Sequence, residues 1–115
     1  MLKTIAEVIS QARESLTIMT IEEAMLVAKQ ENGVIIDVRE PSEYAKKSAG
    51  GTINIPRGLL EMKMLQMYPN EAQPIFLHCA TGARAIFSAE QLKRVGYLNV
   101  SVITSSLDDI CNAWC

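Results

Sequence analysis

Short apolar runs separated by helical patterns constrain the fold of this chain more than any other feature. Residues 34–38 and 75–79 are almost wholly apolar runs of strand length, which is typical of parallel strands buried on both faces. Residues 53–56 and 100–103 are further extended segments, and the second is more polar, so we expect it nearer the sheet edge. This order predicts an α/β fold, with a central, mostly parallel β-sheet flanked by helices on both faces.

The expected helices are marked by apolar residues at three- and four-residue steps and by capping residues. Residues 2–15 show this spacing and predict an amphipathic N-terminal helix. Thr20 and Glu23 form a capping box at the start of a second helix, which runs to about Gln30 and is closed by Asn32-Gly33. The other expected helical segments are one turn after Pro41 and residues 59–67, 85–95 and 107–114.

Length and composition are those of a chain with one hydrophobic core. The 115 residues are 49% hydrophobic, which predicts a single domain over residues 1–115, with residues 1–17 as an N-terminal helical extension. A net charge of −2, without a block of Lys or Arg, argues against nucleic acid or an anionic membrane as a partner. No apolar stretch approaches the roughly 20 residues of a membrane span. Both a monomer and a homodimer remain open.

Cysteine and histidine usage bears on the compartment and on metal binding. Three cysteines are too few for a disulfide scaffold, and polar residues interrupt any secretory signal near the N-terminus, so a cytoplasmic protein is expected. A single histidine without a Cys-x-x-Cys pair predicts neither a metal site nor a cofactor. Cys111 and Cys115 fit one face of a C-terminal helix, where we interpret them as small apolar residues; a resolving thiol is the alternative.

Cys79 stands where a predicted strand ends and a predicted helix begins. Backbone N–H groups converge at such a point and the helix dipole adds about half a positive charge, so a thiol there should ionise more readily than a free thiol. The residues that follow are small, and Gly82 permits a positive φ, so their amides can surround an anion. We therefore expect Cys79 to be an accessible, catalytic nucleophile.

The loop after Cys79 provides the candidate substrate-binding residues. Arg84 adds a permanent cation suited to an oxyanion such as sulfonate or phosphate, unless it is a surface arginine at the start of a helix. Thr81 can supply a hydroxyl donor. The predicted substrate-binding set is Ala80, Thr81, Gly82, Ala83 and Arg84.

His78 precedes the cysteine but is not expected to act on it. Successive strand residues point to opposite faces, so the imidazole should face away from the sulfur. We interpret His78 as a histidine whose nitrogens are satisfied beneath the loop. Activation of Cys79 then has to come from the backbone N–H groups and the helix end, because the chain has no second histidine.

Several segments resemble the successive signatures of the rhodanese domain, in order and with sensible spacing over roughly residues 18–103. Residues 37–44 read Asp-Val-Arg-Glu-Pro-Ser-Glu-Tyr, residues 53–58 read Ile-Asn-Ile-Pro-Arg-Gly and residues 78–84 read His-Cys-Ala-Thr-Gly-Ala-Arg. Residues 96–100 are similar to the family's next strand. The resemblance implies that Cys79 takes a sulfane sulfur from a small anion such as thiosulfate, becomes a persulfide and passes the sulfur to cyanide or a thiol.

The chain also departs from the family pattern in places that border the active-site mouth. Lys47-Ser48-Ala49 stand where members often carry Gly-His-Ile, and Ser105-Ser106 stand where Gly-Gly is usual. Asp37 and Arg39 match the family's most regular motif, and we interpret them as structural, with a strand-end hydrogen bond and an ion pair between Arg39 and Glu43.

Two other functions remain open. His-Cys followed by Gly and Arg also resembles the signature of cysteine phosphatases and arsenate reductases, but that signature places five residues between Cys and Arg, whereas four separate Cys79 from Arg84. A loop one residue shorter forms a smaller ring, better suited to one sulfur atom than to a tetrahedral phosphate. The second alternative is a persulfide carrier or regulatory binding module that acts on a protein donor or acceptor of sulfur.

Overall fold

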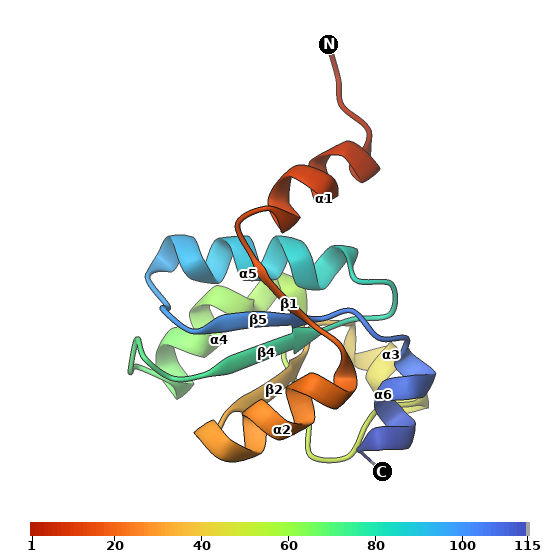
Figure 1. The fold of residues 1–115 in the computed structure, drawn as a ribbon, viewed down its shortest axis with the longest axis vertical. Helices are drawn as coiled ribbons and strands as arrows, with labels where there is room; N and C mark the ends of the chain where they lie inside the picture. Colours follow the sequence, from red (N-terminus) through yellow and green to blue (C-terminus); the bar gives the residue numbers. More distant parts are fainter. Residues whose placement is uncertain (115) are drawn as a thin grey trace.

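The computed structural model describes residues 1–114 and contains a parallel sheet of five strands in the order β1-β5-β4-β2-β3 (Figure 1). The α/β fold and the mostly parallel sheet predicted from the sequence are therefore confirmed. The strands are β1 (Thr17–Met19), β2 (Val34–Asp37), β3 (Ile53–Asn54), β4 (Ile75–His78) and β5 (Val100–Ile103).

Helices cover both faces of the sheet and enclose two hydrophobic clusters. On one face α1 and α4 pack against α5, and Leu77 of β4 lies in the cluster beneath them. On the other face α2 packs against α6, and Phe76 lies in that cluster. In Figure 1 the first turns of α1 project beyond the sheet. The helices are α1 (Ile5–Arg13), α2 (Ile21–Glu31), α3 (Pro41–Lys46), α4 (Leu60–Met67), α5 (Ala83–Val95) and α6 (Leu107–Ala113), with a 3₁₀ turn, η1 (Arg57–Leu59), before α4.

The local signals that mark α2 act as predicted. The Thr20 hydroxyl accepts a hydrogen bond from the Glu23 N–H at 3.3 Å, and the Glu23 carboxylate accepts one from the Thr20 N–H at 3.2 Å. Asn32 ends the helix in the left-handed region, with φ of 56°. These caps satisfy backbone groups that would otherwise lack partners at the helix ends.

One strand was missed, and the place of another was wrong. The helical extension was assigned to residues 1–17 and no strand was predicted before residue 34, but residues 17–19 form β1, which pairs in parallel with β5. Strand β5 was expected near the sheet edge; instead it lies between β1 and β4, and all four of its residues are buried. Both outcomes have one cause, because β1 is only three residues long and pairs with a strand at the far end of the sequence.

No helix within residues 1–114 is both long and apolar enough to cross a lipid bilayer.

Candidate active site

Cys79 directly follows β4, and the loop after it brings backbone donors to its sulfur. The Gly82 N–H donates to Cys79 Sγ at 3.0 Å, and the Ala85 N–H, in the first turn of α5, donates at 3.4 Å. Gly82 has a φ of +96°, and a Cβ at this position would meet nothing within 4 Å. The glycine is therefore required for its backbone conformation rather than for space. This geometry places the sulfur at the positive end of α5.

The sulfur is more covered than the sequence suggested. Cys79 is 2% exposed and belongs to the hydrophobic cluster beneath α5, whereas we expected an accessible nucleophile. The loop side chains around it are small, and Thr81 at the tip is exposed. A donor therefore has to reach the sulfur past backbone, methyl groups and one hydroxyl.

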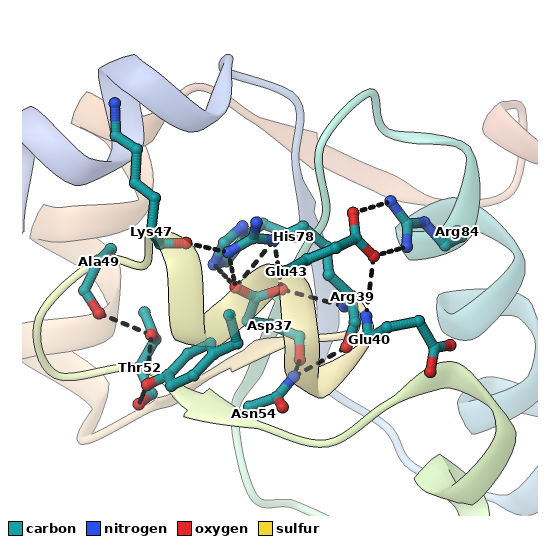
Figure 2. A network of polar contacts seen from close by, with 11 residues as sticks. Asp37, Arg39, Glu40, Glu43, Lys47, Ala49, Thr52, Asn54, His78 and Arg84 are labelled. Carbon is teal, nitrogen blue, oxygen red and sulfur yellow. Dashed lines mark hydrogen bonds and ion pairs between the residues drawn. The ribbon is translucent and has the colours of Figure 1, made fainter.

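The neighbouring strand end, after β2, holds a buried ion pair (Figure 2). Arg39 Nη2 lies 2.7 Å from Asp37 Oδ2, and the side chains are 3% and 0% exposed. Arg39 also donates through Nε to both carboxylate oxygens and through its backbone N–H to Oδ1. Asn54 donates to the carbonyls of Asp37 and Arg39 at 3.0 and 2.8 Å, which ties β3 to the same turn. The hydrogen bond predicted for Asp37 at the strand end is present, and its donor is Arg39.

His78 lies on the opposite side of β4 from the sulfur. Leu77 and Cys79 belong to the cluster beneath α5, whereas Phe76 belongs to the cluster beneath α2. Side chains therefore alternate between the two faces of the sheet, and the imidazole lies on the same face as Phe76. The ring is fully buried, and its Nε2 is 3.8 Å from Asp37 Oδ2.

The expectation that both nitrogens of His78 are satisfied was wrong. Neither Nδ1 nor Nε2 has a hydrogen-bond partner among residues 1–114. For Nε2 the physical reason is that Arg39 donates to both oxygens of the neighbouring Asp37 carboxylate, and the imidazole stays 3.8 Å from Oδ2. Burial lowers the pKa of His78 from its usual 6.5, against an opposing effect of Asp37, so the ring is held in its neutral form.

Arg84 is held by a carboxylate from α3. Its Nη1 and Nη2 donate to Glu43 Oε1 and Oε2 at 2.6 and 3.1 Å, as Figure 2 shows. These bonds lower the pKa of Glu43 to about 2 and raise the pKa of Arg84. The predicted ion pair between Arg39 and Glu43 was wrong, because Arg39 turns to Asp37 and leaves Glu43 to Arg84. Binding of a substrate anion by Arg84 stays a prediction.

The segments that depart from the rhodanese pattern have structural partners here. Lys47 forms an ion pair with Asp108 of α6. Ser106 caps α6 by accepting a hydrogen bond from the Asp109 N–H at 3.2 Å. Ser105 accepts one from the Ile21 N–H, at the start of α2, at 2.8 Å. Sequence reasoning missed these partners and the Glu43–Arg84 pair, since no local spacing signals them.

Other parts of the described chain hold two surface grooves and a second free thiol. Among residues 1–114, no three His, Cys, Asp or Glu side chains gather in a way that could hold a metal ion. Two surface grooves, one beside Tyr97 and one of about 410 Å³ beside Trp114, are not lined by Cys79. Cys111 is a half-buried free thiol, and the prediction for Cys115 lies outside the described residues.

Comparison with known sequences gives one consistent family. The profile of the rhodanese-like domain matches residues 21–113. Thiosulfate:glutathione sulfurtransferase of Saccharomyces cerevisiae is 29% identical over 89 aligned positions, which cover 68% of this chain and 64% of the yeast protein. YrkF of Bacillus subtilis, a protein named for a sulfur-carrier role, is 32% identical over 75 positions, which cover 65% of this chain and 40% of YrkF. This chain thus spans less than two thirds of each of these relatives.

Comparison with solved structures gives the same fold. A Rhodopseudomonas palustris protein of unknown function, described as a possible tyrosine phosphatase, superposes with a TM-score of 0.82 over 98% of this chain and 92% of that chain. Its sequence is 21% identical, so the likeness concerns the fold alone.

Proposed function

Because this chain belongs to the rhodanese-like domain family, we propose that it is a sulfurtransferase in which Cys79 carries sulfane sulfur as a persulfide. The observation that carries the proposal is the pair of backbone N–H groups, from Gly82 and Ala85, that face the sulfur at the start of α5. Donors fixed in this way favour the thiolate before transfer and the anionic persulfide after it. The relatives named for thiosulfate:glutathione sulfur transfer and for sulfur carriage support the same chemistry.

The reaction has two balanced steps. The Cys79 thiolate attacks the outer sulfur of a donor such as thiosulfate; a bond forms between the two sulfur atoms, and the S–S bond of thiosulfate breaks as sulfite leaves with its electron pair. Cyanide or a thiolate then attacks the outer sulfur of the persulfide, and the Cys79 thiolate leaves. Thiocyanate or a new persulfide is the product.

The remaining loop residues surround the donor in this proposal. Ala80, Thr81, Gly82 and Ala83 contact the donor and the persulfide, and Arg84 stands at the rim. His78 takes no part in proton transfer, because it lies on the other side of β4 and its pKa is lowered by burial. The free thiols of Cys79 and Cys111 suit the reducing cytoplasm that the cysteine usage predicted.

Intact-mass measurement tests the assignment of Cys79. Incubation with thiosulfate should add the mass of one sulfur atom, and cyanide should remove it. Cys79→Ala should gain nothing, whereas Cys111→Ala, which removes the other thiol that the structure describes, should gain the sulfur as the wild type does. Equal gain by Cys79→Ala would show that the reacting thiol is elsewhere.

A second candidate function is a persulfide carrier that serves a protein partner. The role for which YrkF is named favours it, and so do apolar side chains on and beside α4: Leu59, Met62 and Leu65 are at least 45% exposed. Rapid loading of Cys79 by a cysteine desulfurase, with weak turnover of thiosulfate, would favour the carrier. Rapid turnover of small donors and no loading by the desulfurase would favour the enzyme.

A further inference from the structure

The charges around Cys79 indicate which sulfur donors the site accepts. Resting on the sulfurtransferase function proposed above, we infer that the site selects sulfane donors with at most one negative charge on the reacting end. Thiosulfonates and thiol persulfides belong to this class, whereas the thiosulfate dianion does not and should load Cys79 more slowly.

The loop itself carries no charged side chain before Arg84. Ala80, Thr81, Gly82 and Ala83 are uncharged. The Gly82 and Ala85 N–H groups already point to the cysteine sulfur, where one negative charge resides during the reaction. A sulfur donor with two negative charges adds to that charge. The end of the helix, with about half an elementary positive charge, compensates for only part of it.

Arg84, the cation of the loop, is neutralised before a donor arrives. Both of its Nη atoms donate to the two oxygens of Glu43, at 2.6 and 3.1 Å. The pKa of Glu43 is about 2, so the carboxylate stays ionised and the pair stays intact at neutral pH. A guanidinium and a carboxylate in this arrangement have no net charge as a unit, and they attract a dianion weakly.

Most cationic side chains of the segments that adjoin the same edge of the sheet are paired with carboxylates. Glu40 lies beside Glu43, is exposed, and has no ion-pair partner among residues 1–114. Lys46, an exposed lysine, lies at the other end of α3. The other cationic side chains on the loops and short helices of this edge are each paired with a carboxylate: Arg39 with Asp37, Lys47 with Asp108, and Arg57 with Glu61.

Two donors of nearly the same shape separate charge from size. Methanethiosulfonate has a methyl group where thiosulfate has one of its oxygens, and it carries one negative charge instead of two. Attack by the Cys79 thiolate forms the S–S bond of the persulfide and releases methanesulfinate with its electron pair. A thiol persulfide, R–S–SH, reacts in the same way: its S–S bond breaks, R–S⁻ leaves, and the proton remains on the transferred sulfur.

The experiment measures kcat/KM for both donors with cyanide as acceptor, in the wild type and in variants that add or free a cation. Ala80→Arg should shift the ratio of thiosulfate to methanethiosulfonate by roughly tenfold toward thiosulfate, because the added cation attracts one more negative charge in thiosulfate than in methanethiosulfonate. Ala80→Gln, which adds a polar chain without charge, should leave the ratio unchanged. Each ratio is measured within one variant, so a partly unfolded sample lowers both values alike.

Removing the carboxylate that neutralises Arg84 is the complementary change. Glu43→Gln should shift the ratio in the same direction. Glu31→Gln makes the same change in charge at the end of α2, next to the opposite ends of the strands, and should not shift it. In the wild type, kcat/KM for thiosulfate should not fall as ionic strength rises, since Arg84 is paired with Glu43 and attracts the dianion only weakly.

Each outcome decides between the inference and the proposed function. A steep fall of the wild-type thiosulfate rate with salt, or an unchanged ratio in both Ala80→Arg and Glu43→Gln, overturns the inference and leaves the sulfurtransferase intact. A third test compares the rate at which each donor loads Cys79, divided by its rate of reaction with a free thiolate. This quotient should be larger for 2-hydroxyethyl persulfide than for thiosulfate, and the reverse order also overturns the inference. If no donor loads Cys79, the proposed function itself fails.

Discussion

The ends of β2 and β4 lie side by side in one sheet, yet they are built in different ways. After β4, small uncharged residues turn so that backbone N–H groups face a sulfur. After β2, the charged side chains of Asp37 and Arg39 are buried together and hold the turn. The first strand end depends on backbone conformation, and the second depends on the identity of paired side chains. Substitutions at the two ends should therefore differ in what they change.

The largest effect is expected at the β2 end. Asp37→Asn leaves Arg39 buried without its anion, which should lower the free energy of unfolding by about 3–5 kcal/mol. Glu61→Gln breaks the Arg57–Glu61 pair, whose side chains are 29% and 34% exposed, and should cost less than about 1 kcal/mol. Urea unfolding measures both. Equal losses would mean that burial does not distinguish these pairs, and the contrast drawn here would fail.

A smaller effect, on the backbone, is expected at the β4 end. Gly82→Ala places a side chain at φ of +96°, which should cost about 1–2 kcal/mol and slow the loading of Cys79 by displacing the Gly82 N–H. Gly58→Ala is the matched control, because its Cβ also meets nothing within 4 Å and its φ lies outside the positive range. If both variants unfold and react alike, backbone conformation is not what the loop depends on.

The smallest effect concerns His78, which lies between the two ends. Its folded-state pKa is below 6.5, so the unfolded chain binds the proton more readily. Stability should therefore be complete above about pH 6.5 and should fall as the pH is lowered toward the folded-state pKa, by at most about 1.4 kcal/mol per pH unit. Urea unfolding between pH 5.5 and 7.5 measures this slope, and in His78→Gln it should be nearly flat. An equal slope in the variant would assign it to other groups.

Features that depend on neighbouring residues could be predicted from the sequence. Thr20 and Glu23 cap α2 because they are three residues apart. Gly96 ends α5 because glycine readily adopts the positive φ that this helix end has. The position of Cys79 between a strand and a helix follows from the same kind of local pattern. The fold class and the place of Cys79 between β4 and α5 could therefore be predicted without the structure.

Features that depend on distant partners could not be predicted. Glu43 was assigned to Arg39, four residues earlier, but its partner is Arg84, which is 41 residues away in sequence. That choice required knowing that Arg39 folds back onto Asp37. The same fact bears on His78, because Arg39 donates to both oxygens of Asp37 and the imidazole Nε2 stays 3.8 Å from Oδ2.

The link between Lys47 and Asp108 has a consequence for recombination among members of this family. Lys47 belongs to a segment in which the chain departs from the rhodanese pattern, and its partner Asp108 lies in the first turn of α6, just after Ser105-Ser106, the other such segment. A hybrid that exchanges only one of these segments would bring together a loop and a helix that were never matched. Residues 46–52 and 104–110 should therefore be transplanted as one unit, although β3, α4, β4, α5 and β5 separate them along the chain.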